Sequence, residues 1–96
     1  MLTIKSPRKT GDTITLKTGA GEEVVARFVE EDTDTITVKR PMTLIPSQQG
    51  IGLGPFAFTL SMEDNVVLNK NVILMIAMTE QEMAAQYTQS TTNIAI

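Results

Sequence analysis

The side chains of this chain that could take part in chemistry are few. Its 96 residues include no cysteine and no histidine, which removes thiolate nucleophiles, disulfides and the commonest general base and metal ligand near neutral pH. The carboxylates fall in expected turns and at an expected helix start, where local structure already accounts for them. Because no set of nucleophile, base and orienting group can be assembled from these residues, we predict that the protein is not an enzyme and uses neither a cofactor nor a metal.

Two short patterns could in principle bind an ion or a phosphate group. Asp32 and Asp34 have the spacing that begins a calcium loop, but the glycine and the closing glutamate of such a loop are missing, which favours a plain turn. The pattern Gly50-x-Gly52-x-Gly54 could cradle a phosphate. It lacks the preceding strand and following helix of a nucleotide-binding fold, so a hairpin tip is the better interpretation.

The charges of the chain are unevenly spread. The formal net charge is −3, which argues mildly against nucleic acid, because Lys and Arg drive phosphate binding by releasing counterions. Residues 1–20 carry four basic side chains and one acid, whereas residues 30–34 are acidic. The basic residues Lys5, Arg8 and Lys9 could form a rim for nucleic acid, but a solvated N-terminus is the simpler interpretation.

The composition is typical of a soluble globular domain, with 42% apolar and 20% charged residues. The longest apolar run, residues 72–78, is far shorter than the roughly 20 residues needed to span a bilayer. A chain of this length predicts a single domain over residues 1–96. Since it has no cysteine and no secretory signal, we expect a cytoplasmic protein, in the host cytoplasm if it is viral.

The elements that must position these residues are mainly short strands. Apolar and polar residues alternate over residues 13–17, 22–29 and 35–39, with a glycine turn and an aspartate turn between them. Residues 12–40 are therefore predicted to form a three-stranded meander.

The middle of the chain is rich in proline and glycine. Residues 41–55 predict a sheet edge or an extended hairpin tip, with unusually many apolar side chains around the glycines. Strand character returns at residues 56–62 and 66–68, and residues 69–71 are predicted to turn. The apolar run 72–78 is predicted to be a strand buried on both faces.

The end of the chain changes to a helical period. Thr79 followed by Glu82 fits a capping box, and a helix over about 80–90 would place Met83 and Tyr87 on one stripe. A helix of about three turns is too short to be stable alone, so it must dock on the sheet.

About five or six short antiparallel strands in so short a chain usually curl into a small barrel or a strongly bent sheet. The order of features is more specific, and it runs through Gly11, Ile14 and Leu16, a glycine turn, Val24, Ala26 and Phe28, Asp32, and then Ile36 and Val38. This order resembles the first signature segment of the Sm-like family, and residues 66–73 lie where its second segment belongs. The resemblance covers about residues 9–79. It is strongest to the stand-alone Sm-like chains of bacteriophages, which share a long apolar loop and a C-terminal helix.

The resemblance implies an all-β fold, a strongly bent five-stranded antiparallel sheet or small open SH3-like barrel of the Sm type. It would have a long hairpin between its third and fourth strands and a short C-terminal helix. The resemblance also implies a homo-oligomeric ring of about five to seven subunits, in which the fourth strand of one subunit pairs with the fifth strand of the next. The candidate interface residues are Val66, Val67, Leu68, Val72, Ile73, Leu74, Met75 and Ile76. Such pairing would also cover an apolar strand that is hazardous as an open edge.

The resemblance further implies a site for single-stranded RNA on two turns. Asp32 matches the acidic residue of the family's first turn, and Lys70 matches the basic residue of its second. Thr35 stands nearest to the position of the expected asparagine, and Asn71 replaces a glycine. The candidate RNA-binding residues are therefore Asp32, Thr35, Asn69, Lys70 and Asn71, with a solvated turn as the alternative interpretation.

Three functions stay open at this point. The first is a ring that binds single-stranded RNA in RNA metabolism or regulation. The second is a structural or adaptor ring without RNA binding, for example a viral component. The net charge of −3, the missing family residues and the scarcity of aromatic residues that could stack on bases favour it. The third is a monomeric SH3-like peptide-binding module, for which exposed aromatic residues are scarce. Neither a membrane nor a small-molecule substrate is expected.

Overall fold

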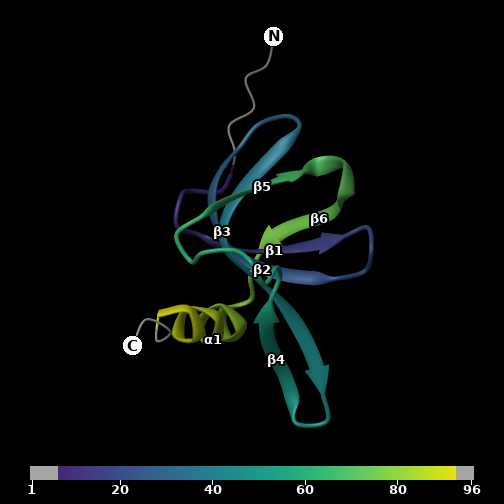
Figure 1. The fold of residues 1–96 in the computed structure, drawn as a ribbon, viewed down its shortest axis with the longest axis vertical. Coiled ribbons are helices and arrows are strands. Elements are labelled where there is room, and N and C mark those ends of the chain that lie inside the picture. Colours follow the sequence, from purple (N-terminus) through teal and green to yellow (C-terminus); the bar gives the residue numbers. More distant parts are fainter. Residues whose placement is uncertain (1–6, 93–96) are drawn as a thin grey trace.

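Within residues 7–92, six strands form one strongly curved antiparallel sheet, with an α-helix packed beside it (Figure 1). The structure is a computed structural model that describes residues 7–92. Its elements are, in order, β1 (Thr13–Thr18), β2 (Glu23–Glu31), β3 (Thr35–Ser47), β4 (Gly50–Pro55), β5 (Asn65–Asn69), the 3-10 helix η1 (Lys70–Val72), β6 (Ile73–Met78) and α1 (Gln81–Thr92). The predicted mainly β fold, with a small open barrel, a long hairpin and a short C-terminal helix, is confirmed.

The strand order leaves the barrel open. The sheet runs β4-β3-β2-β1-β6, and β5 adds to β3 as well. β5 pairs with the first part of β3 and β4 pairs with its last part, so both lie on the edge of β3 opposite β2. Within residues 7–92, β5 has no strand partner other than β3, and β6 has none other than β1. Each of these two strands therefore keeps one free main-chain edge.

The core lies inside the predicted meander, which is confirmed over β1, β2 and the first part of β3. Strand alternation directs one set of side chains inward, and these are fully or almost fully buried: Ile14, Leu16, Val24, Ala26, Phe28, Ile36 and Val38. Later segments cover this core with half-buried side chains, namely Phe56, Val66, Leu68, Ile73 and Ile76. Burial of each large side chain stabilises the fold by about 1.5–3 kcal/mol.

β3 bends where it leaves the barrel, at Arg40 and Pro41. Arg40 has a φ of 52°, in the left-handed region. Between the paired residues Lys39 and Met42, β3 carries two residues where β2 carries one. Proline lacks an N–H group, so a bulge that interrupts the ladder accommodates it. Beyond this bulge, β3 and β4 form a hairpin arm (residues 42–55) that projects from the barrel (Figure 1).

The segment that follows the arm differs from its prediction. Residues 56–62 were expected to be a strand, but residues 56–64 form a loop with two turns. The backbone N–H of Phe56 still bonds to the carbonyl of Pro41 at 3.3 Å, and pairing with β3 resumes only at Asn65. The strand prediction failed because β5 occupies the next part of the β3 edge, which leaves this segment without a partner strand.

The prediction that residues 72–78 are buried on both faces is also wrong for a single copy of the chain. η1 takes up the start of this run, and β6 is an edge strand with Leu74 exposed by 70% and Met78 by 58%. The physical reason is that, among the strands that the structure describes, β6 pairs with β1 alone.

The helix α1 begins and ends within two residues of its predicted bounds, but its cap differs. The Glu80 carboxylate accepts the backbone N–H groups of Glu82 and Met83 at 2.7 and 3.0 Å. These hydrogen bonds hold the pKa of Glu80 below its usual range. The hydroxyl of Thr79, predicted as the cap, instead lies 2.9 Å from that of Thr15 and ties the helix start to β1.

Tyr87 docks α1 onto the barrel. Its side chain is fully buried, and its hydroxyl donates to the carbonyl of Arg40 at 2.8 Å, at the bend of β3. The guanidinium of Arg27 lies over the ring, 5.5 Å from its centroid. Burial raises the pKa of Tyr87 to about 12, which keeps the phenol a neutral donor. Met83 is half-buried on the same stripe, as predicted.

Candidate functional site

The two turns that carry the candidate RNA-binding residues lie side by side. Thr35, the first residue of β3, is directly opposite Asn69, the last residue of β5. The backbone N–H of Lys70 also bonds to the carbonyl of Asp34 at 2.8 Å. The structure therefore brings together the two turns that the resemblance to the Sm-like family places in one site.

Asp32 shapes its own turn. Its Oδ1 accepts the backbone N–H groups of Asp34 and Thr35, each at 2.8 Å, and the Thr35 hydroxyl at 3.2 Å. These hydrogen bonds, helped by the nearby charge of Lys70, hold the pKa of Asp32 below its usual range. One carboxylate oxygen is thus committed to the fold.

Lys70 belongs to an ion-pair network. Its ammonium group lies 2.8 Å from Glu31 Oε1 and donates to the backbone carbonyl of Asp32. The Glu31 side chain is only 7% exposed. Its Oε2 also accepts hydrogen bonds from Arg8, from Nε at 3.0 Å and from Nη2 at 2.7 Å. A carboxylate this deeply placed needs such partners. Lys70 therefore stabilises the junction between β2 and η1.

The sequence pattern does not predict the roles of Arg8 and Glu31. It favours a solvated N-terminus for Arg8 and places Glu31 among the acids of residues 30–34. The pattern gave no sign of their pairing, because they lie 23 residues apart. They meet because the segment before β1 continues alongside β2, with Gly11 bonded to Phe28 and Thr10 to Val29.

The two asparagines of the second turn differ. Asn69 Oδ1 accepts the backbone N–H of Asn71 at 2.9 Å and so caps η1. The side chain of Asn71 is exposed, and it makes no hydrogen bond within residues 7–92. Of the five candidates, Asn71 is therefore the one most available to an outside ligand.

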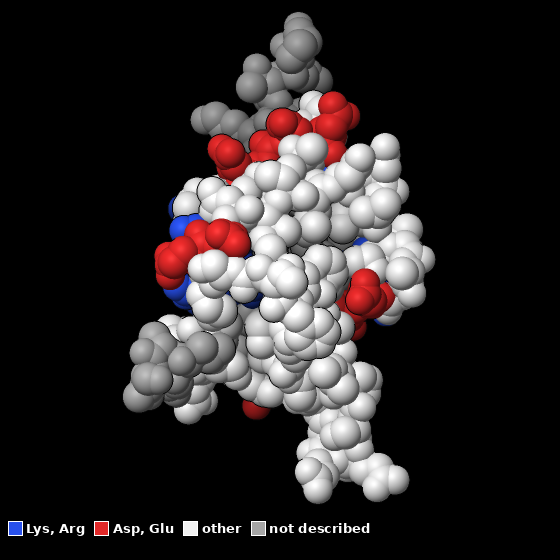
Figure 2. Space-filling view, in the orientation of Figure 1, with Lys and Arg blue, Asp and Glu red and all other residues white. Residues whose placement is uncertain are grey.

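The surroundings of these turns are acidic. Glu30, Asp32 and Asp34 are exposed, and Figure 2 shows acidic groups gathered at the top of the view, where Figure 1 places the turn between β2 and β3. Since phosphate binding depends on Lys and Arg, the negative charge around these turns disfavours binding of a nucleic-acid backbone.

The free edges of β5 and β6 form a second candidate site. Among the candidate interface residues, Val67, Val72, Leu74 and Met75 are exposed, whereas Val66, Leu68, Ile73 and Ile76 are half-buried against the core. Figure 2 shows an uncharged surface across the centre of the face where Figure 1 places these two strands. An apolar patch bordered by charged groups is typical of an interaction surface.

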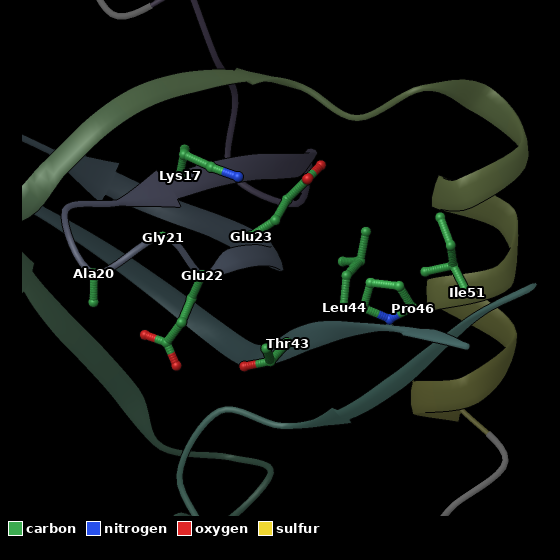
Figure 3. Close-up of a pocket in the computed structure, with 9 residues that line it drawn as sticks. All are labelled: Lys17, Ala20, Gly21, Glu22, Glu23, Thr43, Leu44, Pro46 and Ile51. Carbon is green, nitrogen blue, oxygen red and sulfur yellow. The ribbon is translucent and has the colours of Figure 1, made fainter. Parts of the chain in front are cut away.

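A notch of about 370 Å³ lies between the β1–β2 turn and the arm (Figure 3). It is lined by Lys17, Ala20, Gly21, Glu22, Glu23, Thr43, Leu44, Pro46 and Ile51. Lys17 and Glu23 extend along one side of the notch, and Glu22 points away from them. The sequence gave no signal for this notch because its walls come from segments that are distant in the chain. The mixed charges on its wall do not define a ligand.

Residues 7–92 contain no group of three or more acidic side chains placed to hold a metal ion. Within the same range, no helix is both long and apolar enough to cross a membrane. Comparison of the chain with protein-family models and with curated proteins finds no match.

Proposed function

We propose that copies of this chain assemble through the free edges of β5 and β6 into a homo-oligomeric ring of the Sm-like kind, and that this ring acts as a structural or adaptor scaffold. The observation that carries the proposal is the exposure of β6, an uncharged strand of six residues with one edge that no strand within residues 7–92 pairs. Such an edge is a template for another strand.

The side chains of β6 point to a missing neighbour. Met78 is directly opposite the core residue Ile14 and so faces the core side of the sheet, yet more than half of it is exposed. Leu74 lies where the register shifts, between residues paired with Thr18 and Lys17, and has no cross-strand partner of its own. Both side chains would lose contact with water if a strand of another copy covered the opening of the barrel.

The two free edges favour a ring over a dimer. β5 and β6 are different strands, so pairing β5 of one copy with β6 of the next is a head-to-tail contact. It leaves a free β6 edge at one end of the pair and a free β5 edge at the other. Such contacts repeat and close into a ring when the rotation allows it. Pairing of β6 with β6 would instead give a two-fold dimer.

A direct test is the mass of the assembly in native mass spectrometry. We expect a ring of about five to seven copies for the unchanged chain, and a 10.5 kDa monomer for Leu74→Glu, because a buried unpaired carboxylate is costly. Ile45→Glu is the matched control, since Ile45 is also exposed but lies on the arm. An unchanged chain that stays monomeric at tens of micromolar (a typical working range), or that forms only dimers, would contradict the proposal.

Binding of single-stranded RNA is the second candidate function, favoured by the meeting of the two turns. It would use the exposed Asn71 most directly, because Lys70 and Asp32 already serve the fold. The test adds short uridine-rich and adenine-rich RNA to the ring before mass spectrometry. RNA retained by the unchanged ring and lost from Asn71→Ala would support this function, whereas a bare ring with both oligonucleotides would favour the scaffold.

A further inference from the structure

Phe58 is the most exposed large apolar side chain in the described part of the chain, at 89%. It lies in the loop between the arm and β5, residues 56–64, and that loop is held at both ends. At its start, Phe56 bonds to Pro41 through the backbone, and near its end the carbonyl of Met62 accepts Arg40 Nε at 3.3 Å. Single exposed apolar residues are common, but this one is presented by an anchored loop beside a free strand edge.

The register of the sheet shows what would lie beside this loop in the proposed ring. β5 runs antiparallel to β3, with Asn65 opposite Lys39 and Asn69 opposite Thr35. If β6 of a second copy continues the antiparallel alternation, which is the more stable pairing per residue, its first residues lie beside Asn69. Its last residue, Met78, then lies beside Asn65, and the residues after it follow the loop that precedes β5.

The chemistry of the two surfaces agrees with this placement. Residues 41–62 and 71–79 contain no charged side chain. The end of β6 offers Met78, which is exposed, and the first turn of α1 offers Met83, which is half-buried. A methionine sulfur near an aromatic ring is a favourable contact of about 0.3–1.5 kcal/mol.

The acids at this place are already engaged within their own copy. Arg40 Nη2 lies 3.3 Å from Glu63 Oε2, and Asp64 Oδ2 accepts the backbone N–H of Ser61 at 3.0 Å. Glu80, at the other side of the contact, caps its own helix. These partners reduce the repulsion between the loop and the start of α1.

We infer that Phe58 seats against the β6–α1 junction of a second copy of this chain, next to Met78 and Met83, and anchors the contact that edge pairing begins. This inference rests on the proposed ring. It assigns to residues 56–64 the role of an interface loop, whereas the ring itself requires only the edges of β5 and β6.

Cross-linking tests the placement, because the chain has no cysteine of its own. Copies with Thr59→Cys are mixed with copies with Gln81→Cys under mild oxidation, so that any disulfide between the two variants joins different molecules. Both positions are exposed and leave Phe58 and the methionines intact. We expect a disulfide-linked pair of the two variants, and none when Gln48→Cys at the arm tip replaces Thr59→Cys.

Dilution of the assembly measures the contribution of Phe58. We expect Phe58→Ala to raise the concentration at which the ring dissociates by tenfold or more, as for a central anchor residue, while Ile45→Ala changes it by less than about threefold. A ring that forms normally, gives no Thr59–Gln81 cross-link and dissociates at an unchanged concentration in Phe58→Ala would overturn this inference and leave the ring intact. A chain that forms no ring would overturn both.

Discussion

The turns around Asp32 and Lys70 and the edges of β5 and β6 differ in how completely their groups are satisfied within one copy. In the turns, Asp32 bonds to its own backbone and Lys70 is paired with Glu31. At the edges, apolar side chains such as Leu74 and Val67 are exposed beside unpaired main-chain groups. Polar residues with the spacing of a ligand site thus serve the fold, and apolar residues with the pattern of a core strand stay exposed within one copy.

Removal of the Glu31 carboxylate should have the largest effect on stability. Glu31→Ala would leave Arg8 and Lys70 without their shared anion, and we expect a loss of roughly 3 kcal/mol in the free energy of unfolding. Urea denaturation followed by circular dichroism measures this loss. The matched control is Glu30→Ala, at an exposed neighbouring position, with a change within about 0.5 kcal/mol. Equal effects of the two variants would mean that the network does not stabilise the turns.

Leu74→Ala tests whether the exposed edge of β6 contributes to assembly and not to the stability of one copy. Since Leu74 makes little contact within one copy, the unfolding free energy of the monomer should change by less than about 1 kcal/mol. The ring, in contrast, should dissociate at a concentration about tenfold higher. Sedimentation velocity over a dilution series checks the assembly. A destabilised monomer with an unchanged ring would show that Leu74 is a core residue after all.

Tyr87→Phe tests whether the helix holds the bend of β3 beside these edges. The variant keeps the aromatic side chain and removes the hydrogen bond from its hydroxyl to the carbonyl of Arg40. We therefore expect a loss of about 1 kcal/mol in the free energy of unfolding. Faster amide exchange in the arm should accompany it, since Gln86 of the same helix also bonds to the carbonyl of Ile51 at 3.0 Å. Unchanged amide exchange in the arm would show that the helix does not hold the bend of β3.

The pH dependence of Tyr87 has a defined sign. Its pKa in the fold is about 12, above the ordinary value of 10.0, so the folded state holds the phenolic proton more tightly. The stabilisation is complete below pH 10 and is lost as the pH rises toward 12. Alkaline denaturation should therefore be shallower over this window in Tyr87→Phe than in the unchanged chain.

The smallest expected effect is the loss of stability at acidic pH that the carboxyl groups of Asp32 and Glu80 contribute. The pKa values of Asp32 and Glu80 are lowered by backbone N–H groups, so their contribution is present at neutral pH and is lost as the pH falls through the folded-state values. Asp32→Asn should weaken the acid dependence of unfolding slightly, and Glu80→Gln should do the same at the helix start. Acid titration of the three proteins in parallel measures the difference.

Much of the fold could be predicted because it depends on local patterns. Alternation at Ile14 and Leu16, and again at Ile36 and Val38, defined the meander and its buried face, and the period of Met83 and Tyr87 defined the docked stripe of the helix. These patterns repeat over a few residues. They therefore depend on the geometry of a strand or helix alone.

The partners of individual side chains could not be predicted in this way. The strand expected over residues 56–62 failed because pairing depends on which segment already occupies the edge of β3. Similarly, the cap of α1 moved from Thr79 to Glu80 because β1 offered Thr15 as another partner for the threonine hydroxyl.

The amino-acid sequence alone therefore established a small, mainly β chain with a long uncharged hairpin, a short helix and no residues for thiol or imidazole chemistry. The tertiary structure alone revealed that Lys70 is bound to Glu31, that Tyr87 supports the bend at Arg40, and that β6 lies at an open edge. The reason is that periodicity specifies which face of an element is apolar, whereas the pairing order and curvature of the whole sheet decide what that face meets.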